Sequence, residues 1–318
     1  MFQKWEISAA SGQWNISGEP CSGAAIDSTS FDDKTYNPFI KCDCTSNSNT
    51  TCHITQLRVY AQDVAGVIPQ ELWNLTFLFN LDLGQNYLTG NLSASIGNLY
   101  RMQYLSLGIN ALSGTLPKEL GNLTNLLSLS FSTNNFTGSL PSELGNLVKL
   151  QQLYFDSSGV SGTIPSTFAN LKNLQTVWAS DTELNGRIPD FIGNLSKLTV
   201  LYLEGNSFEG PIPSTFSNLT SLTDLRISAL SNGSSSLAFI KDMKSLRFLE
   251  LRNNNISDSI PSNIGDYQEL TLLDLSFNNI KGQIPDSLFK LSLLSFLFLG
   301  NNRLSGTVPA DKSASLLN

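Results

Sequence analysis

The sequence lacks several features that define common classes of protein. Charged residues are only 14% of its 318 residues and the formal net charge is −7. Nucleic-acid binding and polyanionic ligands are therefore disfavoured, because both need a basic surface. No apolar run approaches about 18 residues, so the sequence predicts no membrane-spanning helix. The first ten residues contain no apolar signal-peptide core, and we expect that a signal was removed or that the chain is a fragment.

Groups for catalysis are also scarce. The single histidine, His53, has no evident nucleophile near it in the sequence, and the carboxylates are scattered along the chain. An active site needs a nucleophile, base or paired carboxylates held together in a cleft. We therefore expect this region to be no enzyme and to hold no cofactor or metal ion.

Cysteines are few, and all four lie before residue 53, at Cys21, Cys42, Cys44 and Cys52. An even, clustered set indicates two disulfides and an oxidising compartment. Zinc binding is the alternative, but the C-x-C spacing is poor for a zinc site and the chain has one histidine. Four cysteines allow three pairings, and a bridge from Cys42 to Cys44 would close a very tight ring. Of the others we favour Cys21–Cys42 with Cys44–Cys52.

Ten N-x-S/T sequons agree with a secreted chain. Four of them fall at one position of a repeated pattern that favours asparagine in any case, so the count alone is modest support. The predicted glycosylation sites are Asn15, Asn49, Asn74, Asn91, Asn122, Asn135, Asn194, Asn218, Asn232 and Asn255.

What the sequence has in abundance is a 24-residue pattern that recurs without insertion or deletion from Leu57 onward. A period in this range predicts a stacked solenoid, since one unit cannot bury its apolar side alone. We expect an N-terminal cysteine-containing cap over residues 1–56 and eleven repeats over residues 57–318. The repeats open at Leu57, Leu81, Leu105, Leu129, Leu153, Val177, Leu201, Leu225, Leu249, Leu273 and Leu297.

Each repeat contains the signals for a strand, a bend and a short helix, as in LSLGINALSGTLPKELGNL from Leu105. The L-x-L opening predicts a strand with leucines pointing inward, and stacked copies predict a parallel sheet. An asparagine five residues later supplies donors and an acceptor for buried backbone groups at the bend. A glycine permits a tight path, and a proline then ends a short second strand.

The repeat over residues 225–248 departs most from this pattern, with Ser234 and Leu237 in place of glycine and proline. We expect tolerated drift, with a local bend or contact site as the alternative.

The pattern L-x-x-N-x-L-S-G-x-I-P with G-N-L resembles the plant-type leucine-rich repeat over residues 57–318. This resemblance implies an α/β repeat fold, a right-handed superhelical horseshoe with a parallel concave sheet. The stretches WNISGEPCSGAAID, IKCDCTSNSNTTCHITQLRVY and LRISALSNGSSSLAFIKDMKSLRFLELRNNN are similar to plant receptor-like kinases that carry a malectin-like domain after their repeats. That group implies a plasma-membrane receptor with a cytoplasmic Ser/Thr kinase, for which cell-wall oligosaccharide sensing has been proposed.

Several parts of such a receptor are missing from this sequence. It contains no malectin-like region, membrane helix or kinase motif, and no cysteine cap closes its C-terminal end. Because solenoid ends need polar caps, we expect the natural chain to continue. We expect an extracellular recognition or co-receptor module at the plasma membrane, with an oligosaccharide or peptide ligand. The alternative is a secreted inhibitor of cell-wall-degrading enzymes.

Two groups of outward residues on the predicted concave sheet are candidate contact sites. The first combines aromatic rings with charged groups, which suits sugar rings or peptide side chains. Its residues are Tyr154, Trp178, Tyr202, Asp156, Glu204, Arg226 and Arg252. The second is an apolar concentration near the C-terminus, for which we expect contact with a following domain or a co-receptor ectodomain. It contains Phe248, Leu272, Phe296 and Phe298, with Phe277 close by.

Overall fold

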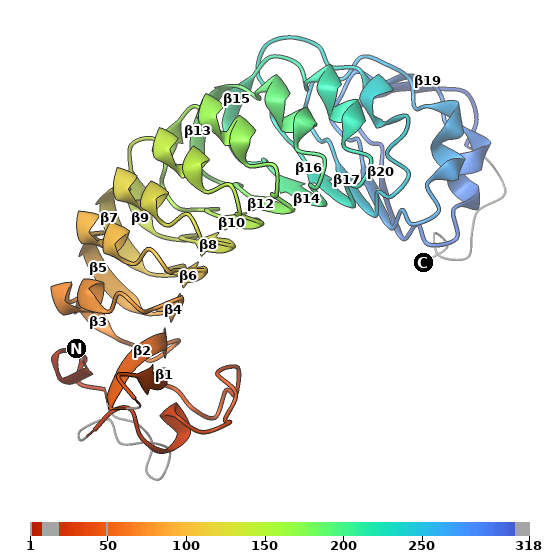
Figure 1. Ribbon diagram of the computed structural model, residues 1–318. Coiled ribbons are helices and arrows are strands. Elements are labelled where there is room, and N and C mark those ends of the chain that lie inside the picture. Colours follow the sequence, from red (N-terminus) through yellow and green to blue (C-terminus); the bar gives the residue numbers. More distant parts are fainter. Residues whose placement is uncertain (1, 8–18, 49, 309–318) are drawn as a thin grey trace. The chain divides into compact units, whose positions relative to one another are not determined.

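The computed structural model describes residues 2–7, 19–48 and 50–308, and it divides into two compact units, Met1–Val160 and Ser161–Asn318. In both, successive repeats place one strand each in a parallel sheet and, in most repeats, a short 3₁₀ helix on the opposite side of the coil (Figure 1).

The first unit begins with the antiparallel hairpin of β1 (Phe39–Ser46) and β2 (Thr51–Arg58). Strand β2 also pairs in parallel with β4, and the sheet continues in the order β4, β6, β8, β10. These strands are β4 (Asn80–Asp82), β6 (Tyr104–Ser106), β8 (Ser128–Ser130) and β10 (Gln152–Tyr154). A second sheet contains β3 (Ala65–Val67), β5 (Tyr87–Asn91), β7 (Ala111–Thr115) and β9 (Asn135–Thr137). The 3₁₀ helices are η1 (Phe2–Trp5), η2 (Gly23–Ala25), η3 (Gln70–Asn74), η4 (Ala94–Asn98), η5 (Lys118–Asn122) and η6 (Ser142–Asn146).

The second unit repeats this plan. Its main parallel sheet contains β12 (Thr176–Trp178), β14 (Val200–Tyr202), β16 (Asp224–Arg226), β17 (Phe248–Glu250), β18 (Leu272–Asp274) and β20 (Phe296–Phe298), in that order. Shorter ladders join β11 (Ser161–Gly162), β13 (Glu183–Arg187) and β15 (Ser207–Glu209), and separately β19 (Lys281–Gln283) and β21 (Arg303–Ser305). The 3₁₀ helices are η7 (Ser166–Asn170), η8 (Asp190–Asn194), η9 (Ser214–Asn218), η10 (Leu237–Ile240), η11 (Ser262–Asp266) and η12 (Asp286–Lys290).

The central residue of each main-sheet strand points into the core. Leu81, Leu105 and Leu225, for example, are almost completely buried. The strands pair with these leucines in register, so that each leucine lies beside its counterpart one repeat away. Burial of an apolar side chain of this size stabilises the fold by about 1.5–3 kcal/mol. The 24-residue period therefore produces the sheet because every repeat has to bury the same positions against its neighbours.

Where a repeat carries the bend asparagine, its side chain satisfies the backbone there, as expected. Asn86 donates from Nδ2 to the carbonyl oxygens of Val59 (2.7 Å), Leu83 (3.0 Å) and Gly84 (3.0 Å). Its Oδ1 accepts from the Val64 amide at 3.1 Å. One buried amide thus links two neighbouring repeats, where unsatisfied polar groups would each cost about 1–3 kcal/mol.

The glycine and proline of the repeat have separate roles. Gly114 has φ +73°, a backbone conformation that residues with a side chain rarely adopt, and a Cβ atom there would also meet the Asn91 side chain. The prolines lie directly before the 3₁₀ helices, as Pro117 does with φ −71° before η5. Proline is suited to this place because its φ is fixed near this value and it needs no amide donor.

The repeat over residues 225–248 loses its second strand. Only isolated bridges, Glu209↔Ser231 and Ser235↔Ile256, replace the ladder there. A hydroxyl group takes over part of the missing backbone pairing, since Ser235 Oγ accepts from the Ile212 amide at 3.0 Å. Ser236 Oγ accepts from the Ala238 amide at 3.0 Å and so begins η10. The departure in sequence therefore changes the strand content locally while the main-sheet strand β16 stays in register with β17.

All four cysteines form disulfides, in the pairing Cys21–Cys42 and Cys44–Cys52 that the sequence favoured. No cysteine remains free, so no thiolate is left for zinc. Within the described residues, no group of three or more His, Cys, Asp or Glu side chains is placed to hold a metal ion.

Candidate functional site

The last residue of each main-sheet strand in the second unit belongs to one continuous column. Parallel pairing places each of them beside its counterpart one repeat away. The column continues through β18 and β20. Its members are Trp178, Tyr202, Arg226, Glu250, Asp274 and Phe298.

The first four members touch one another in sequence, and we call them the recognition row: Trp178, Tyr202, Arg226 and Glu250. The rings of Trp178 and Tyr202 are stacked, with centroids 5.7 Å apart and planes 17° apart. The Arg226 guanidinium carbon lies 4.5 Å from the Tyr202 ring centroid, and Arg226 Nε lies 3.4 Å from Glu250 Oε1. Trp178 is 41% exposed, so the row presents a ring to solvent at one end and an ion pair at the other.

Burial and neighbouring charges shift two acidic groups beside the row. Burial raises the pKa of Tyr202, and the positive charge of Arg226 opposes this. Burial also raises the pKa of Glu204, although its own backbone amide, the Ser180 hydroxyl and Arg226 favour the charged form. Glu204 Oε2 is shielded from solvent and has no hydrogen-bond partner in the described part of the chain. A half-buried carboxylate thus lies close to the stacked rings.

Tyr154 and Asp156 belong to the first unit. Tyr154 is half-buried and pairs in register with Ser130. Asp156 Oδ1 accepts a hydrogen bond of 2.5 Å from Ser132 Oγ. Because Trp178 lies in the second unit, the three-ring row of Tyr154, Trp178 and Tyr202 stays a prediction.

The apolar residues near the C-terminal strands are partly exposed. Phe248, Leu272 and Phe296 lie side by side in register, the first two half-buried and Phe296 exposed. Phe298 and Phe277 are also exposed. The Arg252 guanidinium carbon lies 4.5 Å from the Phe277 ring centroid, so this arginine contacts the apolar group. Its role in ligand binding stays a prediction.

No sequon asparagine among the described residues lies in a strand of the main sheet, although Asn91 and Asn135 lie in the second-sheet strands β5 and β9. Every one in the described residues is exposed. Four are the last residues of the 3₁₀ helices η3, η5, η8 and η9. Asn15 and Asn49 lie outside the described residues. Glycosylation stays a prediction for all of them.

Glu250 and Ser180 were absent from the candidate residues chosen from the sequence. Arg226 and Glu250 are 24 residues apart, so the repeat period alone places their opposite charges side by side on neighbouring strands. The sequence alone was therefore enough to predict this pair. Ser180, which lies beside Glu204, was harder to predict from the sequence. A serine in an outward column is ordinary for a solvated position and gives no sign of a site.

Comparisons with known proteins identify the repeat. The Leucine Rich Repeat family model matches residues 125–147, 197–219, 245–267 and 269–291. The fold is a plant-type leucine-rich-repeat solenoid. Over 79 residues the chain is 58% identical to a probable LRR receptor-like serine/threonine-protein kinase of Arabidopsis thaliana, an alignment that covers 24% of this chain and 8% of that protein. The chain is thus homologous to plant receptor-like kinases, and the aligned part is less than a tenth of such a relative's length.

Two solved structures extend the similarity. The LRR ectodomain of the Arabidopsis receptor kinase HAESA, in complex with an IDA peptide hormone, is 33% identical with a TM-score of 0.77 over 85% of this chain and 45% of that chain. The LRR ectodomain of the Arabidopsis thaliana receptor kinase GASSHO1/SCHENGEN3, in complex with CASPARIAN STRIP INTEGRITY FACTOR 2, is 33% identical with a TM-score of 0.72, over 81% of this chain and 34% of that chain. In the described residues no helix has the length and apolar character that a membrane crossing requires.

Proposed function

We propose that this chain is the extracellular ligand-recognition module of a plant receptor-like kinase and that it binds a peptide at the recognition row. The observation that carries the proposal is the exposed Trp178 ring stacked on Tyr202, continued by the Arg226–Glu250 ion pair. Support comes from the two similar ectodomains, both of which have a peptide hormone or a named factor bound.

The chemistry of the row suits a peptide with an apolar side chain. A rigid, amphipathic aromatic ring offers a large contact area at low entropic cost, and such rings are common energetic centres of interfaces. Arg226 and Glu250 offer a donor and an acceptor beyond the rings, where they can bind the peptide backbone or a polar side chain. Because both partners of the ion pair are about one-third exposed, a ligand can reach them without breaking a buried charge pair.

The remaining parts of the receptor belong to the same proposal. Residues 1–56 would cap the repeats of residues 57–318, and a malectin-like domain, a membrane helix and a Ser/Thr kinase would follow. The protein would then act at the outer face of the plasma membrane. The exposed Phe277, Phe296 and Phe298 would contact the following domain or a co-receptor ectodomain.

One observation favours a second ligand class. Stacked, exposed rings also suit sugar rings, so a neutral cell-wall oligosaccharide is the competing ligand at Trp178 and Tyr202. The secreted inhibitor remains the competing role for the whole chain, and the full-length sequence of the natural protein would distinguish the two roles.

The test is a selection of displayed random dodecapeptides against the chain, followed by calorimetric titration of the synthesised winners and of cellotetraose. Trp178→Ala should weaken peptide binding about thirtyfold, because truncating a central aromatic anchor costs about 2 kcal/mol. Tyr104→Ala is the matched control, since Tyr104 is an outward, similarly exposed aromatic residue in the first unit. This variant should leave the Kd of the peptides unchanged.

Each other outcome is informative. Binding of cellotetraose that depends on Trp178, without peptide binding, would assign the row to an oligosaccharide. Peptide binding that is indifferent to Trp178→Ala would remove recognition from this row.

A further inference from the structure

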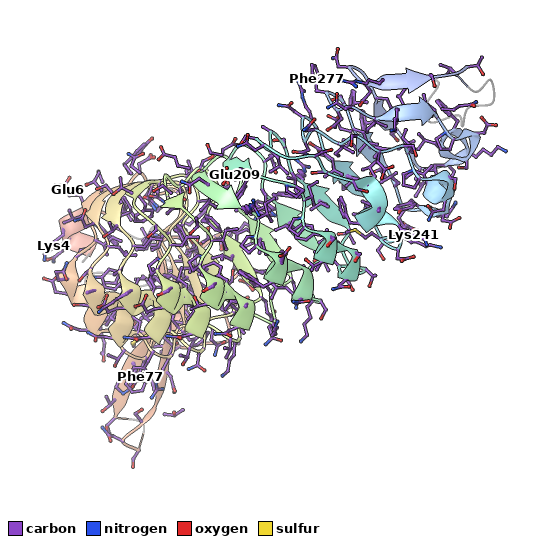
Figure 2. The ribbon with its side chains drawn as sticks, turned by 90° about the horizontal axis from the view of Figure 1, so that it is seen from above. Lys4, Glu6, Phe77, Glu209, Lys241 and Phe277 are labelled. Carbon is purple, nitrogen blue, oxygen red and sulfur yellow. A yellow bond between two sulfur atoms is a disulfide. The ribbon has the colours of Figure 1, made fainter. Side chains whose placement is uncertain are left out.

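A pocket in the first unit lies outside the recognition row. Its cavity has a volume of about 440 Å³, which is within the range of small-ligand sites. Asp43 and Thr55 line it from the β1–β2 hairpin, and Phe77, Phe79, Arg101 and Gln103 line it from the following repeats. Figure 2 shows Phe77 beside the place where this hairpin projects from the rest of the unit.

The walls of the pocket are held in place by several contacts. The Cys44–Cys52 disulfide joins the two hairpin strands, in which Asp43 pairs with His53. The His53 ring is stacked on Phe77, with centroids 3.6 Å apart and planes 6° apart. The Arg101 guanidinium carbon lies 4.1 Å from the Phe77 ring centroid. The aromatic floor is therefore fixed before any ligand arrives, which lowers the entropic cost of binding.

The polar groups around the pocket differ in what they still have to offer. Asp43 Oδ1 already accepts a hydrogen bond of 3.0 Å from the Thr45 amide. In contrast, the side chains of Arg101 and Gln103 make no hydrogen bond to any residue that the structure describes. The hydrogen-bonding groups that remain available to a ligand are the guanidinium donors of Arg101 and the side-chain amide of Gln103, which has both donors and an acceptor.

Charge and polarity then restrict the ligand. Asp43 balances the charge of Arg101 across the lining, and the whole chain is net negative, so an anion is disfavoured. Two phenylalanine rings require an apolar group, whereas the free amide and guanidinium require carbonyl and N–H groups beside it. An extended polypeptide presents these groups together, with its side chain on one side and its backbone amide alongside.

We propose that this pocket anchors an extended peptide segment of a protein partner. An apolar side chain packs on Phe79 and against the edge of the Phe77 ring, whose faces are covered by His53 and Arg101. Gln103 pairs with a backbone amide, and Arg101 donates to a neighbouring backbone carbonyl. The site shares no residue with the recognition row, so it holds whether or not the row binds a peptide.

The experiment uses the whole chain and the same displayed dodecapeptide library, selected in parallel against wild type and Gln103→Ala. Peptides enriched only by wild type are synthesised and titrated by calorimetry. Their Kd should rise at least about tenfold in Gln103→Ala and in Arg101→Gln, because a ligand amide then loses its partner. Replacing their apolar anchor residue by serine should have a similar effect.

Matched controls separate this site from the fold and from the row. Gln151→Ala removes a glutamine at the same position two repeats later, which does not line the pocket, and it should leave Kd unchanged. Trp178→Ala should also leave these peptides unaffected, while it weakens those that bind the row. If no selected peptide depends on both Gln103 and Arg101 for its Kd, or if cellobiose displaces the peptides that only wild type enriches, the peptide assignment is overturned.

Discussion

Arg58 and Arg226 occupy the same outward position of their repeats, yet their surroundings differ completely. Arg58 is 9% exposed and donates to the carbonyl oxygens of Phe31 and Asp33, each at 2.6 Å, and of Tyr36. Arg226 is about one-third exposed and contacts a tyrosine ring and a glutamate. The backbone of the two strands is equivalent, so the neighbours alone decide the role of each arginine.

This difference separates a structural end of the sheet from a binding surface. At β2 the loop over residues 31–36 covers the outward position, and an arginine there joins the loop to the first repeat. At β16 no loop covers the described strand face, and the same residue type stays available to a ligand. An outward position is therefore necessary for a contact residue, but it is sufficient only where no other part of the chain covers that position.

The largest expected effect comes from removing the bridge that closes the covering loop. Residues 31–36 lie inside the segment joined by Cys21–Cys42, a separation of 21 residues. The double variant Cys21→Ser/Cys42→Ser should lose about 3 kcal/mol in free energy of unfolding, since the unfolded chain regains loop entropy. Guanidinium unfolding measures this.

The second disulfide supplies the comparison. Cys44–Cys52 joins residues only 8 apart, so its removal should cost less than removal of Cys21–Cys42. An equal or larger loss on its removal would mean that closure of the covering loop is not what stabilises this end.

The next effect tests the two arginines directly. Arg58→Met should lower the free energy of unfolding by about 2 kcal/mol, because three carbonyl oxygens lose charged donors. Arg226→Met removes the same group and should cost less than about 1 kcal/mol, as expected for a partly exposed ion pair. Thermal and denaturant unfolding of the two variants, compared with wild type, checks the contrast. Similar losses would show that burial by the loop does not distinguish the two positions.

The sequence predicted the repeated part of the molecule well for a physical reason. Period, inward leucines and the bend asparagine are imposed on every repeat by the same packing, so each copy repeats the signal. The period alone indicates that Arg58 points outward, but it does not indicate that a loop covers this position. The loop that buries it belongs to the non-repeated N-terminal segment, where no period indicates which backbone carbonyls will meet the guanidinium.

The candidate site was predictable to the extent that it follows the period. Register places Trp178 beside Tyr202 and Arg226 beside Glu250, and each pair is 24 residues apart. The pocket under the hairpin was not predicted. It depends on His53 of the non-repeated segment stacking on Phe77, a contact that no repeat spacing encodes.

A smaller effect concerns coupling within the row. A double-mutant cycle of Arg226→Gln and Glu250→Gln should give a coupling energy of about 0.2–1 kcal/mol, because the pair is partly exposed. The coupling should shrink as salt is added, since exposed charges are screened. The measurement is urea unfolding of the four proteins at low and high salt. A coupling that is insensitive to salt would contradict an exposed pair.

The smallest effect contrasts the pH dependence of carboxylates in the two regions. Hydrogen bonds from Thr35 hold the pKa of Asp33 below its usual range, so its contribution to stability is present above the unfolded pKa and lost as pH falls. Burial raises the pKa of Glu204, so the sign is opposite. The folded state favours the protonated form, and its contribution is present below the unfolded pKa and lost as pH rises through the folded value.

Glu204→Gln should therefore be slightly more stable than wild type at pH 7, because glutamine is neutral and the half-buried charge is gone. The advantage should diminish as pH falls through the raised pKa of Glu204, because the Glu204 carboxyl of the wild type then also becomes neutral. Unfolding free energies of both proteins between pH 4 and pH 7 measure the difference, with Asp33→Asn as the variant of opposite sign. A Glu204→Gln protein that is less stable than wild type at pH 7 would show that the Ser180 hydroxyl and Arg226 outweigh burial. Glu204 would then be a carboxylate that Ser180 and Arg226 keep in its charged form.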